Sequence, residues 1–127
     1  MMFARVSILI AAVCFVGFGV WFLSDPSGAG ATVEIVVGTP TARTDFRATY
    51  GGFNIGIGVF LLLCALQKEW LRPGLWAQIC IFLGYAMGRG FGLLTDAEPV
   101  RMMYWLFATE LSGAALGLAA LRNLGRE

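Results

Sequence analysis

The sequence has 127 residues, of which 58% are hydrophobic and only 13% are charged, and its net charge is +1. This composition argues against a soluble domain, which is nearer half apolar and a quarter charged, and the small net charge argues against a nucleic-acid partner. Histidine is absent, and the three cysteines (Cys14, Cys64 and Cys80) lack a CxxC spacing, which argues against a metal site, a disulfide framework and an ordinary hydrolase.

Four apolar stretches separated by short charged gaps predict membrane-spanning helices over residues 5–23, 47–66, 75–94 and 100–121. The first holds about 18 uncharged residues after Arg5, more than the apolar centre of a secretory signal, so we expect a retained span. A soluble helical domain is the alternative, but its helices would need polar faces that these stretches lack. The predicted fold class is all-α: one integral membrane domain, a bundle of four transmembrane helices with one irregular external loop.

The external loop covers residues 24–44 and is the only long connection in the sequence. Asp25 and Pro26 predict the end of the first helix. Residues 32–37 alternate imperfectly and are rich in β-branched side chains, which predicts a short extended piece. Thr39 and Pro40 form a good N-cap and first-turn pair, so the second helix is expected to begin there, ahead of the membrane.

Polar side chains enter the second span near its start. On a regular α-helix, Arg47, Asn54 and Gly58 fall on one face. Gly52 and Gly56 fall on the opposite face as a GxxxG pair. Both faces are therefore expected to meet protein rather than lipid. For Arg47, anchoring at the level of the lipid head groups is an equal alternative.

Glu110 lies near the middle of the fourth span, where a charged carboxylate is costly unless it is paired, protonated or hydrated. Arg89, in the third span, lies about 7 Å shallower, and its extended side chain can cover most of that gap. A structural ion pair is one interpretation, and a proton relay or ligand site is the other. Together with nearby polar residues this pair defines the predicted polar cluster, which consists of Arg47, Tyr50, Asn54, Tyr85, Arg89 and Glu110.

Glycine pairs at four-residue spacing recur in the last three spans and predict close helix packing. The predicted packing residues are Gly52, Gly56, Gly84, Gly88, Gly113 and Gly117. Four tryptophans fall near predicted span ends, as expected of aromatic belts at the membrane surface, namely Trp21, Trp70, Trp76 and Trp105. We expect no metal site and no cofactor.

Several of these residues form a recognisable pattern. It combines Arg-x-x-Tyr-Gly-Gly at residues 47–52, Gly88-Arg89, the Glu98-Pro99 turn and Glu110. In this pattern the chain resembles a family of small bacterial membrane proteins catalogued as "domain of unknown function 4345". The resemblance covers roughly residues 40–115 and implies four spans and a shared Arg, Tyr, Gly and Glu pattern. It implies no particular activity.

Four spans place both termini on one side of the membrane. Five lysines and arginines lie on the terminus side (Arg5, Lys68, Arg72, Arg122 and Arg126), and four lie on the other (Arg43, Arg47, Arg89 and Arg101). By the positive-inside rule we expect a bacterial inner-membrane protein with both termini in the cytoplasm.

The many small-residue faces favour a non-enzymatic accessory subunit of a membrane assembly, which packs against a partner protein or another copy of itself. A small ligand-binding or proton-coupled transport protein that uses the polar cluster is the alternative, and its ligand is unknown. An intramembrane enzyme is the third hypothesis. We expect no enzyme and no catalytic residue, because neither a histidine nor a reactive cysteine pair is available as an acid–base couple.

Overall fold

The computed structural model describes residues 1–96 and 98–126. These residues form helices and no strand, and four helical segments among them are long and apolar enough to cross a membrane. The prediction of an all-α fold with four such segments is confirmed. The second and third segments begin earlier than the predicted spans, at Pro40 and Lys68. The reason is that hydropathy marks only the uncharged stretch, whereas helical hydrogen bonding continues into the flanking polar residues.

The four segments contain shorter elements. The second consists of an α-helix, a π-helical turn and another α-helix, and the third begins with a short 3-10 turn. In chain order the elements are α1 (Met2–Ser24), α2 (Pro26–Ala31), α3 (Pro40–Phe46), η1 (Arg47–Gly52, π-helical), α4 (Phe53–Leu66), η2 (Lys68–Trp70, 3-10), α5 (Leu71–Thr95) and α6 (Arg101–Leu124).

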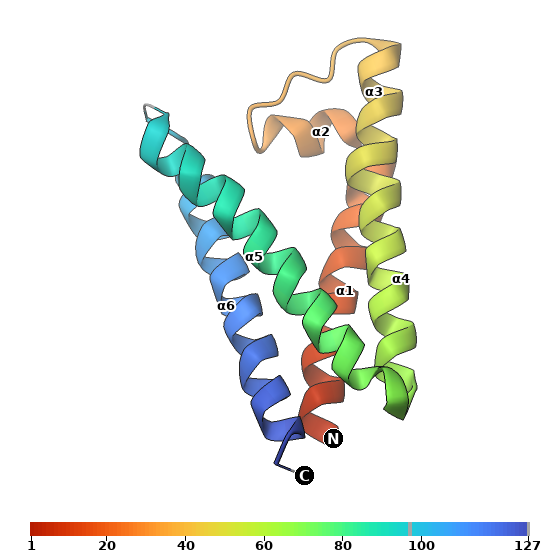
Figure 1. Cartoon of the computed structure of the whole chain (residues 1–127). Helices are drawn as coiled ribbons and strands as arrows, with labels where there is room; N and C mark the ends of the chain where they lie inside the picture. Colours follow the sequence, from red (N-terminus) through yellow and green to blue (C-terminus); the bar gives the residue numbers. More distant parts are fainter. Residues whose placement is uncertain (97, 127) are drawn as a thin grey trace. The chain divides into compact units, whose positions relative to one another are not determined.

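The chain divides into two compact units. The first unit comprises Met1–Ala11 and Leu61–Glu127, and the second comprises Ala12–Phe60. In the first unit, α5 and α6 lie side by side and run in opposite directions (Figure 1). Gly74 of α5 allows close packing in this unit, because an added Cβ there would lie 2.6 Å from the Cβ of Cys64 and 3.1 Å from Cδ1 of Ile8.

The second unit is held by close contact between the end of α1 and the η1–α4 segment. A Cβ added to Gly19 would lie 2.7 Å from Cγ1 of Ile55. A Cβ on Gly58 would lie 2.5 Å from Cγ2 of Val16, and one on Gly51 would lie 3.0 Å from the Leu23 nitrogen. Real Cβ atoms essentially never come within 3.0 Å of other atoms and seldom come within 3.4 Å, so the two helices approach each other because these three positions are glycines.

The loop between α1 and α3 contains the short helix α2, which the sequence did not predict. The side chain of Asp25 caps α2 by accepting a 3.0 Å hydrogen bond from the Gly28 N–H. Residues 32–34 form a turn instead of the predicted extended piece, and Glu34 has a left-handed φ of 60°. The turn arises because the N–H of Ile35 returns to the Gly30 carbonyl, 2.9 Å away, at the end of α2.

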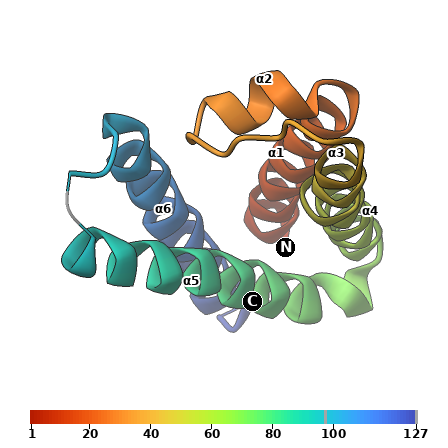
Figure 2. The same cartoon turned by 90° about the horizontal axis from the view of Figure 1, so that it is seen from above.

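The predicted start of the second helix is confirmed. Thr39 is the N-cap of α3, and its hydroxyl accepts a 3.1 Å hydrogen bond from the Ala42 N–H, with Pro40 in the first turn. Helix α2 lies beside α3 (Figure 2). Ala29 of α2 is buried together with Phe46 of α3. The loop is therefore a folded cap over this end of the second unit.

Candidate functional site

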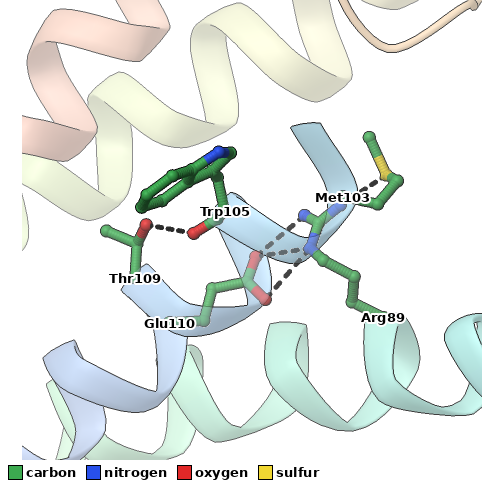
Figure 3. Close-up of polar contacts among 5 residues, drawn as sticks. All are labelled: Arg89, Met103, Trp105, Thr109 and Glu110. Atoms are coloured by element: carbon green, nitrogen blue, oxygen red, sulfur yellow. Dashed lines mark hydrogen bonds and ion pairs between the residues drawn. The ribbon is translucent and has the colours of Figure 1, made fainter. Parts of the chain in front are cut away.

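The centre of the candidate site is an ion pair between α5 and α6 of the first unit (Figure 3). Arg89 of α5 donates from Nε to both carboxylate oxygens of Glu110, at 3.0 and 3.1 Å. Its Nη2 donates to Glu110 Oε1 at 2.8 Å. The guanidinium therefore meets the carboxylate with its Nε–Nη2 edge, a charge-assisted geometry that fixes both side chains more firmly than a single contact would.

The pair is mostly buried, but not equally at its two ends. The Glu110 side chain is 10% exposed and the Arg89 side chain is 21% exposed. On its other side, Arg89 donates from Nη1 to the sulfur of Met103, 3.2 Å away. A thioether is a weak acceptor, so the carboxylate dominates the attraction. The arrangement pairs the glutamate with a cation inside a helix that is long and apolar enough to cross a membrane, where an unpaired carboxylate would be costly.

Two contacts between phenylalanine and glycine frame this ion pair along the α5–α6 seam. A Cβ on Gly90 would lie 3.1 Å from the Phe107 ring, and a Cβ on Gly113 would lie 2.8 Å from the Phe82 ring. Each ring therefore packs on the backbone of the opposite helix. The two helices are held at a separation that lets Arg89 and Glu110 meet directly.

A second buried polar group, absent from the predicted cluster, lies further along the same seam. Gln78 of α5 is 1% exposed and donates from Nε2 to the Gly113 carbonyl and to the Ser7 hydroxyl, both at 3.0 Å. Ser7 is fully buried. These bonds connect α1, α5 and α6 within the first unit. Ser7 interrupts an otherwise apolar stretch of the first span, and this interruption is the sequence signal that could have indicated its buried polar contact.

The remaining residues of the predicted cluster have separate surroundings. Arg47 donates from Nε to the carbonyl of Leu23, 3.0 Å away, at the end of α1. The Tyr50 ring stacks on Phe46 with centroids 4.5 Å apart. Both contacts lie within the second unit, whereas Arg89 and Glu110 belong to the first. Tyr85, one turn before Arg89 on α5, is 38% exposed.

The Arg-x-x-Tyr-Gly-Gly motif coincides with the π-helical turn η1. Asn54 follows this turn, is 6% exposed, and donates from Nδ2 to the carbonyl of Tyr50. A π turn has more residues than an α turn. The angle between a side chain before η1 and one after it therefore cannot be counted as if the whole segment were a regular α-helix. Arg47 bonds to α1 and Asn54 bonds to its own helix, so a shared face for these two residues remains a prediction.

The six predicted packing glycines fall into two groups. Gly113 and Gly117 meet α5, and a Cβ on Gly117 would lie 2.9 Å from Cγ1 of Ile79. In contrast, a Cβ added to Gly56 would meet no atom of residues 12–60 within 4 Å. The same holds for Gly84 and Gly88 with respect to the described residues of the first unit.

Gly52 and Gly56 instead line an open apolar groove on η1 and α4, together with Ala48, Phe53, Ile57 and Phe60. The close contacts of the second unit use other glycines, at positions 19, 51 and 58.

Within the described part of the chain, no three His, Cys, Asp or Glu side chains are grouped so that they could hold a metal ion.

Comparison with known families places the chain. The sequence model of the family described as Domain of unknown function (DUF4345) matches residues 3–121. The chain belongs to the DUF4345 family. The predicted resemblance is confirmed, and the match includes the Arg89–Glu110 pair, the π-helical motif and the Ser7–Gln78 contact. No curated protein and no solved structure matches the chain.

The geometry of this DUF4345 protein limits what the ion pair does chemically. Both Glu110 oxygens accept from Arg89, and three of the five guanidinium N–H donors are directed at Glu110 or Met103. The direct effect of the pair is to fix α5 against α6.

Proposed function

We propose that this DUF4345 protein is a non-enzymatic membrane protein that serves as an accessory subunit, packing against transmembrane helices of a partner or of a second copy. Its environment is the bacterial inner membrane, with both termini in the cytoplasm. The observation that supports this role is the set of open glycine pairs, Gly52 with Gly56 and Gly84 with Gly88, which meet no neighbouring helix in their own units.

These glycines weaken the helices that contain them. A glycine inside a helix is about 1 kcal/mol less favourable than alanine. In lipid, where apolar surfaces gain little from meeting one another, glycine pairs compensate for this cost only when another backbone approaches closely. Gly113 and Gly117 have that neighbour inside the chain. The open pairs gain it when a second helix docks.

The Arg89–Glu110 pair fits the same role. A rigid α5 keeps Gly84 and Gly88 in a fixed orientation, and the ion pair fixes α5 against α6 one residue beyond Gly88. A subunit that presents a preformed helix face pays less ordering entropy on association.

A matched set of variants tests this proposal. Gly56→Leu and Gly88→Leu fill the two open faces, while Gly17→Leu changes an equally open glycine of α1 that has no second glycine four residues away. The proteins are purified in mild detergent and analysed by mass spectrometry for stoichiometric protein partners and self-association. We expect a complex with the wild type and with Gly17→Leu, and its loss with Gly56→Leu or Gly88→Leu.

Two results contradict the accessory role. One is a wild-type protein that is monomeric and free of protein partners when extracted from its native membrane. The other is a complex that survives both test variants as well as it survives Gly17→Leu.

A ligand-binding or proton-coupled transport protein is the second candidate. The observation that favours it is the low exposure of Glu110 in a helix long enough to cross a membrane. This candidate predicts a bound small molecule rather than a protein in the same mass spectra. It also predicts that Glu110→Gln abolishes retention of that molecule without dissociating any protein complex.

A further inference from the structure

One end of the first unit carries a concentration of positive charge. We call it the basic end, and it consists of Arg5, Lys68, Arg72, Arg122 and Arg126. The N-terminus, the start of α5 and the end of α6 all lie at this end (Figure 1). In the sequence, the acidic residues within four positions of these cations are Glu69 and Glu127.

The helix register shows that these cations lie at one level. Gln78 and Gly117 face each other across the α5–α6 seam. At 1.5 Å per residue, Arg72 lies about 9 Å beyond this contact along α5, and Arg122 lies about 8 Å beyond it along α6. Arg5 joins them from α1, since its Nη1 donates to the carbonyl of Leu66, 3.5 Å away, at the end of α4.

The cations are available for an external partner. Lys68, Arg72, Arg122 and Arg126 are exposed, and their side chains form no hydrogen bond or ion pair with any described residue. Lys68 and Arg72 are four residues apart, and so are Arg122 and Arg126. Lys68 precedes α5 and Arg126 follows α6, so neither pair lies within one regular helix, but like charges this close in the chain repel each other unless an anion lies between them.

We propose that the basic end binds the head groups of anionic phospholipids. Lys68, Arg122 and Arg126 lie within two positions of the first or last residue of a helix that is long and apolar enough to cross a membrane. This places them at the depth of the lipid head groups. Trp70 and Trp76 flank Arg72 and are 42% and 51% exposed, as expected of side chains at the lipid–water boundary. A lipid phosphate at this level meets cations from two helices at once. The proposal needs no protein partner and goes beyond the accessory role.

The test uses the full-length protein in detergent. Its melting temperature and lipid affinity are measured with added phosphatidylglycerol, and with phosphatidylcholine at the same mole fraction. A polybasic segment gains about fivefold in affinity for anionic lipid per cation. The double variant Arg72→Gln/Arg122→Gln should therefore bind phosphatidylglycerol roughly 30-fold more weakly than the wild type and lose most of the added thermal stability.

Two further variants control for charge and for folding. Arg43→Gln/Arg101→Gln removes the same charge from residues that are not part of the basic end and should keep the response to phosphatidylglycerol. Arg72→Lys/Arg122→Lys keeps the charge and should keep the response even if the glutamine variant folds poorly. The proposal is overturned if phosphatidylcholine or inorganic phosphate stabilises the wild type equally well. It is also overturned if the Arg43/Arg101 variant loses the response as completely as the Arg72/Arg122 variant, or if the lysine variant loses it while remaining folded.

Discussion

Replacing the two members of the Arg89–Glu110 pair singly and together measures how strongly they interact. Removing one partner of a buried pair costs about 3–5 kcal/mol, because the other charge is left uncompensated. For Arg89→Gln we expect about 3 kcal/mol, since the stranded Glu110 side chain is only 10% exposed. For Glu110→Gln we expect less, about 2 kcal/mol, because Arg89 is 21% exposed and the new amide oxygen still accepts one bond.

The double variant Arg89→Gln/Glu110→Gln leaves no buried charge, and two amides can bond to each other. It should cost no more than Arg89→Gln alone, which corresponds to a coupling energy of about 2–3 kcal/mol. Unfolding is measured for all four proteins in the same detergent, and Arg101→Gln, at the exposed start of α6, serves as a charge control.

Additive losses would refute the reasoning, because they would show that the two side chains do not interact energetically. A Glu110→Gln protein that is as stable as the wild type would also refute it. That result would favour a Glu110 that changes protonation during its function, as the transport hypothesis requires.

Three further predictions follow from the packing and the loop. Gly117→Leu should lower the melting temperature in detergent, because even a Cβ there would lie 2.9 Å from Ile79. Gly56→Leu should leave the melting temperature of the isolated chain nearly unchanged, because a Cβ there meets no described atom of its unit within 4 Å. Equal losses in the two variants would contradict the assignment of Gly117 to a packed face and Gly56 to an open one. Gln78→Leu strands the buried Ser7 hydroxyl and should cost about 2 kcal/mol, and adding Ser7→Ala should recover part of it, so a more severe double variant would argue against the contact. In intact cells, Val36→Cys, at a loop position 90% exposed, should react with an impermeant thiol reagent, and labelling only after lysis would reverse the proposed orientation.

Features that depend on hydropathy or on a single interaction could be predicted from the sequence. Uncharged stretches predicted all four long helices. The cost of placing Glu110 inside a membrane predicted Arg89 as a partner within reach, and the structure brings these two side chains together. The start of α3 was predictable because the cap is local, involving only Thr39 and its immediate neighbours.

Features that depend on neighbouring helices were not predictable in the same way. Every GxxxG pair has the same spacing, so spacing alone does not separate Gly113, which meets the Phe82 ring, from Gly84, which meets no described atom of its unit. Helix α2 was missed because two of its six residues are glycines, which disfavour a helix, and because it depends on the Asp25 cap and on burial of Ala29. The π turn has no hydropathy signal at all.

The π turn also bears on which changes of length the second long helix can accept. On the N-terminal side, Phe46 is buried with Ala29 and Val37 under the loop. On the C-terminal side, Gly58 lies against Val16 of α1. A π turn takes one more residue than an α turn to complete nearly the same rotation, so deleting one residue within Arg47–Gly52 would leave Phe46 and Gly58 close to their present directions. Deleting one residue between positions 53 and 57, where the helix is regular, would instead turn Gly58 away from α1 by about 100°. The second unit therefore depends on sequence length in α4 more than in the Arg-x-x-Tyr-Gly-Gly motif.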